Sequence, residues 1–213
     1  MPIRTGLVAG VGLAALGLAG LALYGSGLVG GNGGSADAPC AASAPTLVRV
    51  SAAARGEVAG MQAPARPRPE PEIRFKGPDG AETSLSDLRG KVLLVNLWAT
   101  WCAPCKAEMP ALDRLQGAMG GPDFGVVAIN VDTRNLDKPA EWLKQAGIQH
   151  LPFYADPAGR VLPIFQRDAE SAGLPTTMLV DRAGCTVGVM KGAADWASPD
   201  GQALIRAALG QGA

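Results

Sequence analysis

The sequence has little of what metal sites and nucleic-acid binding require. Its 213 residues include one histidine, and 18% of them are charged, with a formal net charge of +0. The lone His150 excludes any metal site that needs two or more histidines. The balanced charge provides no basic surface for phosphate groups. We therefore expect neither a metal ion nor a nucleic-acid partner, and the length favours one domain with appendages.

Polar side chains are absent from residues 6–23, and this absence predicts a membrane segment. The run is 18 residues long, which is enough to span the hydrocarbon core as a helix. We place a transmembrane signal-anchor helix at residues 6–24. A cleaved signal peptide is the rival interpretation, but its apolar region is usually only about 7 to 15 residues long. A buried core helix is a third interpretation, although such a helix would normally keep a polar face.

Basic residues are also missing after this segment. Arg4 precedes the segment, and the next basic residue is Arg49. The positive-inside rule then places residues 1–5 in the cytoplasm and the remainder of the chain outside it. In a bacterium this predicts a single-pass inner-membrane protein whose main domain lies in the periplasm, where disulfides persist.

Residues 25–71 are predicted to be a Gly/Pro-rich linker and an N-terminal extension. Residues 25–39 have the composition of a flexible spacer. The pattern of residues 40–60 leaves open whether they form a helix or a strand. Residues 63–72 contain four prolines, which predicts an extended connector.

Residues 72–213 alternate between strand and helix patterns. Continuous apolar runs at 92–98 and 124–131 are typical of strands buried on both faces. The other expected strands are 73–75, 176–181 and 185–190, and the expected helices are 103–119, 138–146 and 199–209. This order predicts an α/β domain in which helices cover both faces of a mixed sheet.

Cys102 and Cys105 lie where the strand at 92–98 gives way to the helix at 103–119. The first cysteine is then at the amino end of a helix, where free N–H groups and the helix dipole stabilise a thiolate. The second cysteine is one turn away and can close a disulfide with the first. The pair predicts a redox centre that works by thiolate attack and needs no cofactor.

Two other interpretations explain this pair less well. A zinc half-site would need a second Cys or His pair, and Cys40, His150 and Cys185 offer no paired spacing. A purely structural disulfide would not explain why the pair lies at a strand-to-helix junction next to Trp101.

Residues 95–110, VNLWATWCAPCKAEMP, resemble the active-site signature of the thioredoxin superfamily. The matching positions are Trp98, Trp101, Cys102, Pro104, Cys105 and Pro110. Residues 173–177, GLPTT, match the cis-proline loop of that family, and the inserted stretch before them is similar to its membrane-anchored TlpA-like branch. The resemblance implies a thioredoxin fold, with Trp101, Leu174 and Pro175 binding the substrate protein.

The resemblance also assigns roles to the remaining cysteines and to Glu108. Cys40 and Cys185 look like the structural disulfide of TlpA-like proteins that serve oxidase assembly. Many thioredoxins have a buried aspartate where this chain has Asn96, which cannot titrate. Similar reductases have a glutamate at the position of Glu108, which would accept the Cys105 proton. A solvated glutamate on the helix surface remains the alternative.

The expected activity is that of a protein-disulfide oxidoreductase acting as a reductase. Ala103 and Pro104 supply no charge that would make a strong oxidant. Thr176 follows the cis-proline, where cytochrome c maturation reductases tend to have an acidic residue. The expected clients are therefore the copper chaperone or oxidase subunit of haem-copper oxidase assembly, with apocytochrome c as the alternative. We expect a monomer with a membrane electron donor, and a Cu(I)-binding metallochaperone is the hypothesis from another class.

Overall fold

The computed structural model describes residues 38–171 and 173–211. The cytoplasmic N-terminus expected at residues 1–5, the membrane helix expected at residues 6–24 and most of the predicted spacer lie outside the described residues. Within the two described ranges, no helix is both long enough and apolar enough to cross a bilayer.

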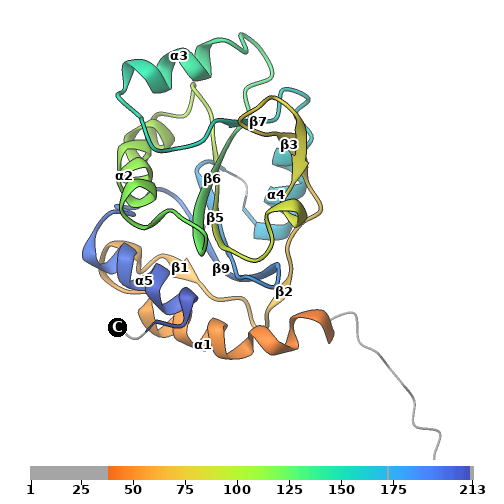
Figure 1. Cartoon of the computed structure of the whole chain (residues 1–213), viewed down its shortest axis with the longest axis vertical. Coiled ribbons are helices and arrows are strands. Elements are labelled where there is room, and N and C mark those ends of the chain that lie inside the picture. The colour runs from red at the N-terminus through yellow and green to blue at the C-terminus, as the bar shows by residue number, and fades with distance from the viewer. Residues whose placement is uncertain (1–37, 172, 212–213) are drawn as a thin grey trace, which may run out of the picture. The chain divides into compact units, whose positions relative to one another are not determined.

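A mixed sheet forms the centre of the fold, and the predicted α/β class is confirmed (Figure 1). The strands are β1 (Met61–Gln62), β2 (Arg68–Pro69), β3 (Arg74–Lys76), β4 (Glu82–Ser84), β5 (Val92–Trp98), β6 (Phe124–Asn130), β7 (Tyr154–Ala155), β8 (Thr176–Val180) and β9 (Cys185–Lys191). Their order in the described sheet is β1-β9-β8-β5-β6-β7-β3-β4, and β2 also pairs with β9. β5, β6 and β7 run parallel, while β8 and β9 are antiparallel to their neighbours.

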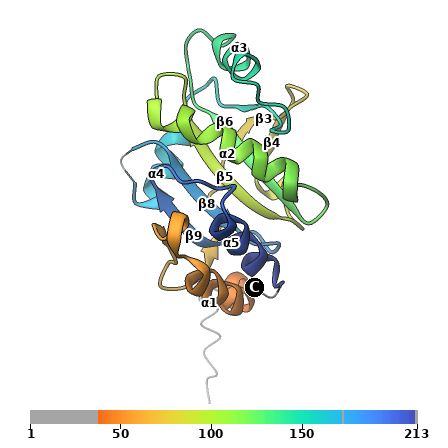
Figure 2. The same ribbon diagram turned by 90° about the vertical axis from the view of Figure 1, so that its left-hand side faces the viewer.

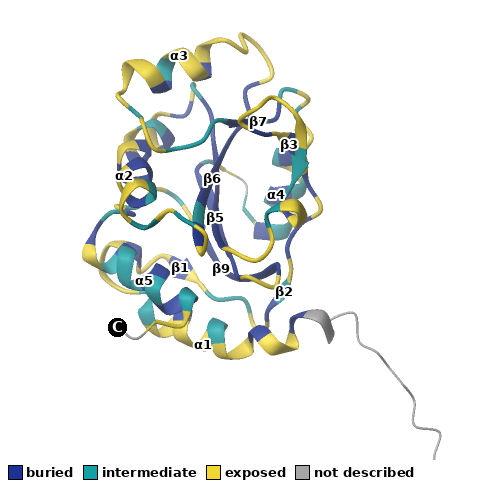
Figure 3. Cartoon of the chain, in the orientation of Figure 1, coloured by how far each residue is buried: buried dark blue, intermediate teal, exposed yellow. Residues whose placement is uncertain are grey.

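Helices cover both faces of this sheet, as Figures 1 and 2 show. The helices are α1 (Ala44–Ala53), α2 (Ala103–Met119), α3 (Lys138–Gln145), α4 (Val161–Ala169) and α5 (Pro199–Leu209), with short 3-10 helices η1 (Ala38–Ser43), η2 (Gly56–Val58) and η3 (Ser86–Leu88). α2 and α5 lie on one side of the sheet and α4 on the other. Every residue of β5 is buried, because this strand has a neighbour on each side and helices above and below it (Figure 3).

The N-terminal extension is part of the same packed unit. Its undecided segment forms α1, which packs against α5 and β9. The proline-rich connector is extended, and Arg68 and Pro69 pair with Thr186 and Cys185 of β9. A proline fits there because it has no backbone N–H group that would need a partner on the outer side of an edge strand. The extension therefore adds strands to the domain that was expected to begin at residue 72.

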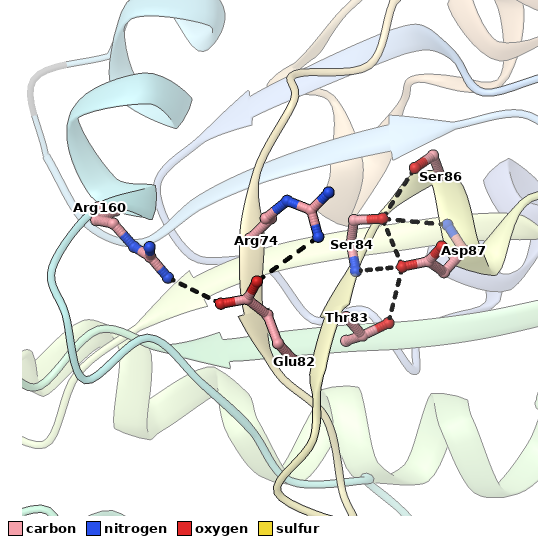
Figure 4. A network of polar contacts seen from close by, with 7 residues as sticks. All are labelled: Arg74, Glu82, Thr83, Ser84, Ser86, Asp87 and Arg160. Carbon is pink, nitrogen blue, oxygen red and sulfur yellow. Dashed lines mark hydrogen bonds and ion pairs between the residues drawn. The ribbon is translucent and has the colours of Figure 1, made fainter.

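The β3–β4 hairpin carries a surface network of polar contacts (Figure 4). Glu82 lies between two guanidinium groups, 3.6 Å from that of Arg74 and 3.3 Å from that of Arg160. Farther along the hairpin, the Asp87 carboxylate accepts hydrogen bonds from the backbone N–H and the hydroxyl of Ser84. The side chains of the Arg160–Glu82 pair are 59% and 43% exposed, so this pair adds little to stability.

Candidate active site

Cys102 is the N-cap residue of α2 and is joined to Cys105 by a disulfide. The backbone of Cys102 is extended, and the residue ends the segment that connects β5 to α2. Its sulfur accepts a hydrogen bond of 3.2 Å from the Cys105 N–H. Cys102 is 5% exposed and Cys105 is fully buried. An N–H group that points at the Cys102 sulfur stabilises negative charge there after reduction, so Cys102 is the sulfur suited to nucleophilic attack.

The turn before Cys102 is held by the carboxylate of Asp132, which belongs to none of the motifs in the sequence. Asp132 follows β6, and its side chain accepts hydrogen bonds from the backbone N–H and the hydroxyl of Thr100, at 2.8 and 3.1 Å. The amide of Asn130 donates to the same carboxylate at 2.8 Å. A polar residue directly after a buried strand was the available signal, because such a residue lies at the carboxyl edge of the sheet. The anchored turn leaves Trp101 67% exposed beside the cysteines.

The predicted cis-proline loop lies at the same edge of the sheet. The Leu174–Pro175 peptide bond is cis. Thr176, the next residue, pairs with Leu97 of β5, one residue before the end of that strand. The carbonyl of Pro175 accepts a hydrogen bond from Gly192. The structure therefore brings Leu174 and Pro175 to the end of β5 from which the chain leads to Cys102.

Glu108 is buried on α2, one turn after Cys105, and its side chain is not the solvated alternative considered above. It is 3% exposed. Its Oε1 atom accepts a hydrogen bond from Asn96 Nδ2 at 2.8 Å. Its Oε2 atom accepts two more, from Trp196 Nε1 at 3.0 Å and from the Ala194 N–H at 3.1 Å. Burial raises the pKa of Glu108 to about 7, although the three donors act in the opposite direction.

Asn96 takes its orientation from the neighbouring strand. Its amide nitrogen donates both to Glu108 and to the hydroxyl of Thr177, which is its partner on β8. The residue at the expected position of a buried acid therefore acts as a donor to a carboxylate on the adjacent helix. Trp196 was missed in the sequence, because it is 88 positions away from Glu108 and no local pattern connects them.

Trp98 and Lys106 lie on the side of α2 that faces α3. Trp98 is fully buried, as expected for a core residue. Its ring centroid is 5.6 Å from that of Trp142 on α3. The Lys106 ammonium group lies 5.8 Å from the centroid of the Trp142 ring, a cation–π distance.

Cys40 and Cys185 form a second disulfide, across 145 residues. Both residues are 1% exposed. Cys185 begins β9, and its backbone N–H donates to the side chain of Asp181. This bond fastens η1, and with it α1, to the edge of the sheet. In the described part of the chain, no three His, Cys, Asp or Glu residues are grouped so that they could hold a metal ion.

Comparisons with known proteins agree with this geometry. The sequence profile of the AhpC/TSA family matches residues 68–187. The chain belongs to the AhpC/TSA family. This is a thioredoxin-like family, and the predicted membership of the thioredoxin superfamily is confirmed. The match runs from β2 into β9 and includes both cysteines of the Cys102–Cys105 pair.

Three relatives carry names that refer to thiol–disulfide chemistry. The chain is 30% identical over 122 residues to thiol-disulfide oxidoreductase ResA of Bacillus subtilis (strain 168), covering 57% of this chain and 65% of ResA. It is 35% identical over 131 residues to thiol:disulfide interchange protein HelX of Rhodobacter capsulatus, covering 60% of this chain and 64% of HelX. The chain thus spans just under two thirds of these curated relatives. The crystal structure of a thiol:disulfide interchange protein from Chlorobium tepidum TLS is 29% identical, with a TM-score of 0.56, covering 69% of this chain and 99% of that one.

Proposed function

We propose that this chain is a protein-disulfide oxidoreductase that reduces disulfides of specific client proteins. The observation that carries the proposal is the position of Cys102, which caps α2 with its sulfur hydrogen-bonded to the Cys105 N–H while Glu108 is buried one turn beyond. One cysteine is thus prepared as a thiolate, the other can resolve a mixed disulfide, and a carboxyl group lies nearby to take a proton.

The proposed reaction begins with the reduced pair. The Cys102 thiolate attacks one sulfur of the client disulfide, and the other client sulfur leaves as a thiolate that takes a proton from solvent. Glu108 then accepts the proton of the Cys105 thiol. The Cys105 thiolate attacks the Cys102 sulfur, the bond between Cys102 and the client breaks, and the second client sulfur leaves. Two electrons have passed to the client, and Cys102 and Cys105 are joined.

Clients are proposed to lie across Trp101, Leu174 and Pro175. Trp101 offers an exposed indole beside the Cys102 sulfur. In the superfamily that the sequence resembles, the backbone of the residue before the cis-proline pairs with the bound chain, and that residue is Leu174.

The direction of electron flow is proposed from the dipeptide between the cysteines. A strong oxidant stabilises its reduced form, and Ala103 and Pro104 bring no charge that would add to the stabilisation from the helix. We therefore propose a reductant that receives its electrons from a membrane carrier. A measured reduction potential near that of strong oxidants would overturn this direction while leaving the exchange activity intact.

The proposed clients are proteins that assemble the copper site of a haem-copper oxidase. Two features support this choice over apocytochrome c: the Cys40–Cys185 disulfide and the neutral Thr176 after the cis-proline. The Cys105→Ser chain tests it, because Cys102 still attacks while the mixed disulfide cannot be resolved. Trapping of a copper chaperone or oxidase subunit supports the proposal, trapping of apocytochrome c alone redirects it, and stoichiometric retention of Cu(I) without trapping favours the metallochaperone.

Membrane attachment belongs to the same proposal. Residues 6–24 are proposed to anchor the chain in the inner membrane as a single span, with residues 72–213 as the catalytic domain in the periplasm. Recovery of the full-length chain in the membrane fraction, with the domain open to protease from the periplasmic side, is the expected result. A soluble periplasmic product that lacks the first residues would instead indicate cleavage.

A further inference from the structure

Glu108 is shielded from bulk solvent, yet the proposed reaction requires it to take up and release one proton in every cycle. Glu108 is among the residues that line a cavity of about 460 Å³ between α2 and the loop after β9. The lining residues that matter here are Glu57, Glu108, Ala111, Arg114, Ala194 and Asp195. We call it the α2–loop cavity. Neither cysteine is among its lining residues.

The loop over this cavity provides two of the three donors to Glu108. Ala194 donates its backbone N–H and Trp196 its indole N–H, both to Oε2. Asp195, the residue between them, is turned toward α2, where its carboxylate lies 3.7 Å from the guanidinium of Arg114. Because 61% and 50% of these two side chains are exposed, the pair contributes little to global stability. The Arg114–Asp195 pair matters because it connects α2 with the loop, and these two elements form walls of the cavity.

We propose that the α2–loop cavity is the path by which Glu108 exchanges its proton with solvent, and that Arg114 and Asp195 are positioning residues that keep the loop donors on the Glu108 carboxylate. The proposal rests on the function proposed above. In this arrangement the client binds over Cys102 while the proton leaves by another route, between α2 and the loop.

Charged groups reach the cavity from three elements. Arg114 comes from α2, Asp195 from the loop, and Glu57 from η2 of the N-terminal extension. Glu57 is itself placed by its backbone N–H, which donates to Asp200 of α5. The groups that face Glu108 from the sheet are neutral, namely Asn96 and, through it, Thr177. Arg114 is therefore the one cation among the described residues that line the cavity.

The proposal predicts how the pH dependence of resolution responds to Arg114→Gln. Hydrogen-bond donors to a carboxylate favour its ionised form and lower its pKa, and Ala194 and Trp196 act on Glu108 in this way. Releasing the loop weakens these two hydrogen bonds, so the pKa of Glu108 should move upward by about half a unit to one unit. Trp196→Phe removes one donor and keeps an aromatic ring, and it should shift the pKa in the same direction. Arg114→Lys keeps the charge and should restore most of the original profile.

The measurement uses the reduced full-length chain mixed with excess dithiobis-nitrobenzoate. The first release of coloured thiolate reports attack by Cys102, and the second reports resolution by Cys105. The second phase should accelerate as pH rises through the pKa of Glu108, and its midpoint should move up in Arg114→Gln. A carbon NMR titration of the Glu108 carboxyl group in the oxidised chain gives the same shift independently of kinetics.

Arg160→Gln is the matched control, because Arg160 pairs with Glu82 at a similar exposure on the β3–β4 hairpin (Figure 4). It should leave both phases unchanged. An Arg114→Gln profile that superimposes on the wild-type profile overturns the proposal. If the wild-type chain shows neither phase, the proposed function has failed instead, so the two failures are distinguishable.

A second variant tests the cavity itself. Ala111 is one helical turn after Glu108 and lines the same cavity, so a larger side chain there occupies the proposed path. Ala111→Leu should slow the second phase several-fold and leave the first phase unchanged, while Ala111→Ser, which keeps the volume open, should slow neither. Equal second-phase rates in the two variants, with circular dichroism like that of the wild type, would contradict a proton path through this cavity.

Discussion

The two disulfides of this chain have the same covalent chemistry and opposite surroundings. Cys102 and Cys105 are separated by three positions, at a helix start beside an exposed tryptophan. Cys40 and Cys185 are separated by 145 positions, and both are buried where the N-terminal extension meets β9. The first bond closes a loop too short to stabilise the fold much, while the second closes one that includes most of the domain.

The comparison shows that the surroundings of a disulfide assign its role. The Cys102–Cys105 disulfide has an N–H group directed at one sulfur and a buried carboxyl group one turn away. In the proposed reaction the N–H group stabilises the Cys102 thiolate and the carboxyl group takes the Cys105 proton. The Cys40–Cys185 bond has η1 on one side and β9 on the other, so it fastens the extension to the sheet in addition to the packing of α1 on α5 and β9.

The largest effect is expected from removing the attacking sulfur. Cys102→Ser should lower the rate of disulfide exchange by at least about a thousandfold, because an alcohol is not ionised at neutral pH. The measurement is turnover of a protein disulfide by the full-length chain. The Cys40→Ser/Cys185→Ser double variant is the control and should retain exchange when it is folded. Equal losses in both variants would remove the distinction between the two bonds.

The next effect is a difference in reducibility within one molecule. Limiting reductant should open Cys102–Cys105 at least about a hundredfold faster than Cys40–Cys185. Cys102 is 5% exposed and precedes a helix at the surface, whereas Cys40 and Cys185 are both 1% exposed and attack on either requires local unfolding. Alkylation after brief reduction, followed by peptide mass spectrometry, identifies which cysteines were opened. Labelling of Cys40 at the rate of Cys102 would contradict this prediction.

Removal of the Cys40–Cys185 disulfide should affect stability more than activity. The Cys40→Ser/Cys185→Ser double variant should lose about 2 to 4 kcal/mol of unfolding free energy, because its unfolded chain is no longer cross-linked. Denaturant unfolding of the oxidised proteins provides the measurement. Cys102→Ser/Cys105→Ser is the matched variant, and it should lose less because its loop is short. A larger loss of unfolding free energy in Cys102→Ser/Cys105→Ser would show that the Cys102–Cys105 disulfide is the structural one.

The smallest effect concerns Glu108 and depends on pH. Burial raises the pKa of Glu108 from its usual 4.5 to about 7 in the folded chain. The folded state thus holds the proton more tightly than the unfolded state, so this group's contribution to stability is complete below pH 4.5 and is lost as pH rises through about 7.

The unfolding free energy of Glu108→Gln should accordingly rise relative to that of the wild type as pH increases, by at most about 3 kcal/mol at pH 8. The buried Asn96 Oδ1, which has no partner among the described residues, can accept from the new amide if the Asn96 side chain flips. Thermal unfolding of the oxidised chains at pH 4 and pH 8 tests this. A difference that does not change between the two pH values would mean that Glu108 titrates normally.

Local pattern was sufficient for the elements next to the cysteines. The strand predicted at 92–98 and the helix predicted at 103–119 coincide with β5 and α2. α4 was not predicted, because Pro163 interrupts its pattern. That proline lies in the first turn, where its missing N–H has no helical partner to lose. The two-residue strands β1, β2 and β7 are too short to show an alternating pattern, and pairing with longer neighbours is what defines them.

The sequence by itself determined that Cys102 begins a helix directly after a buried strand, and that Glu108 follows Cys105 by one turn, because these relations depend only on the repeat of a helix and on hydrophobic pattern. Tertiary structure alone decided that Glu108 is buried, that Trp196 and Ala194 bind its carboxylate, and that Asp132 holds Thr100. These contacts join segments that are distant along the chain. Their partners are selected by which strands and helices pack together, and no local repeat encodes that selection.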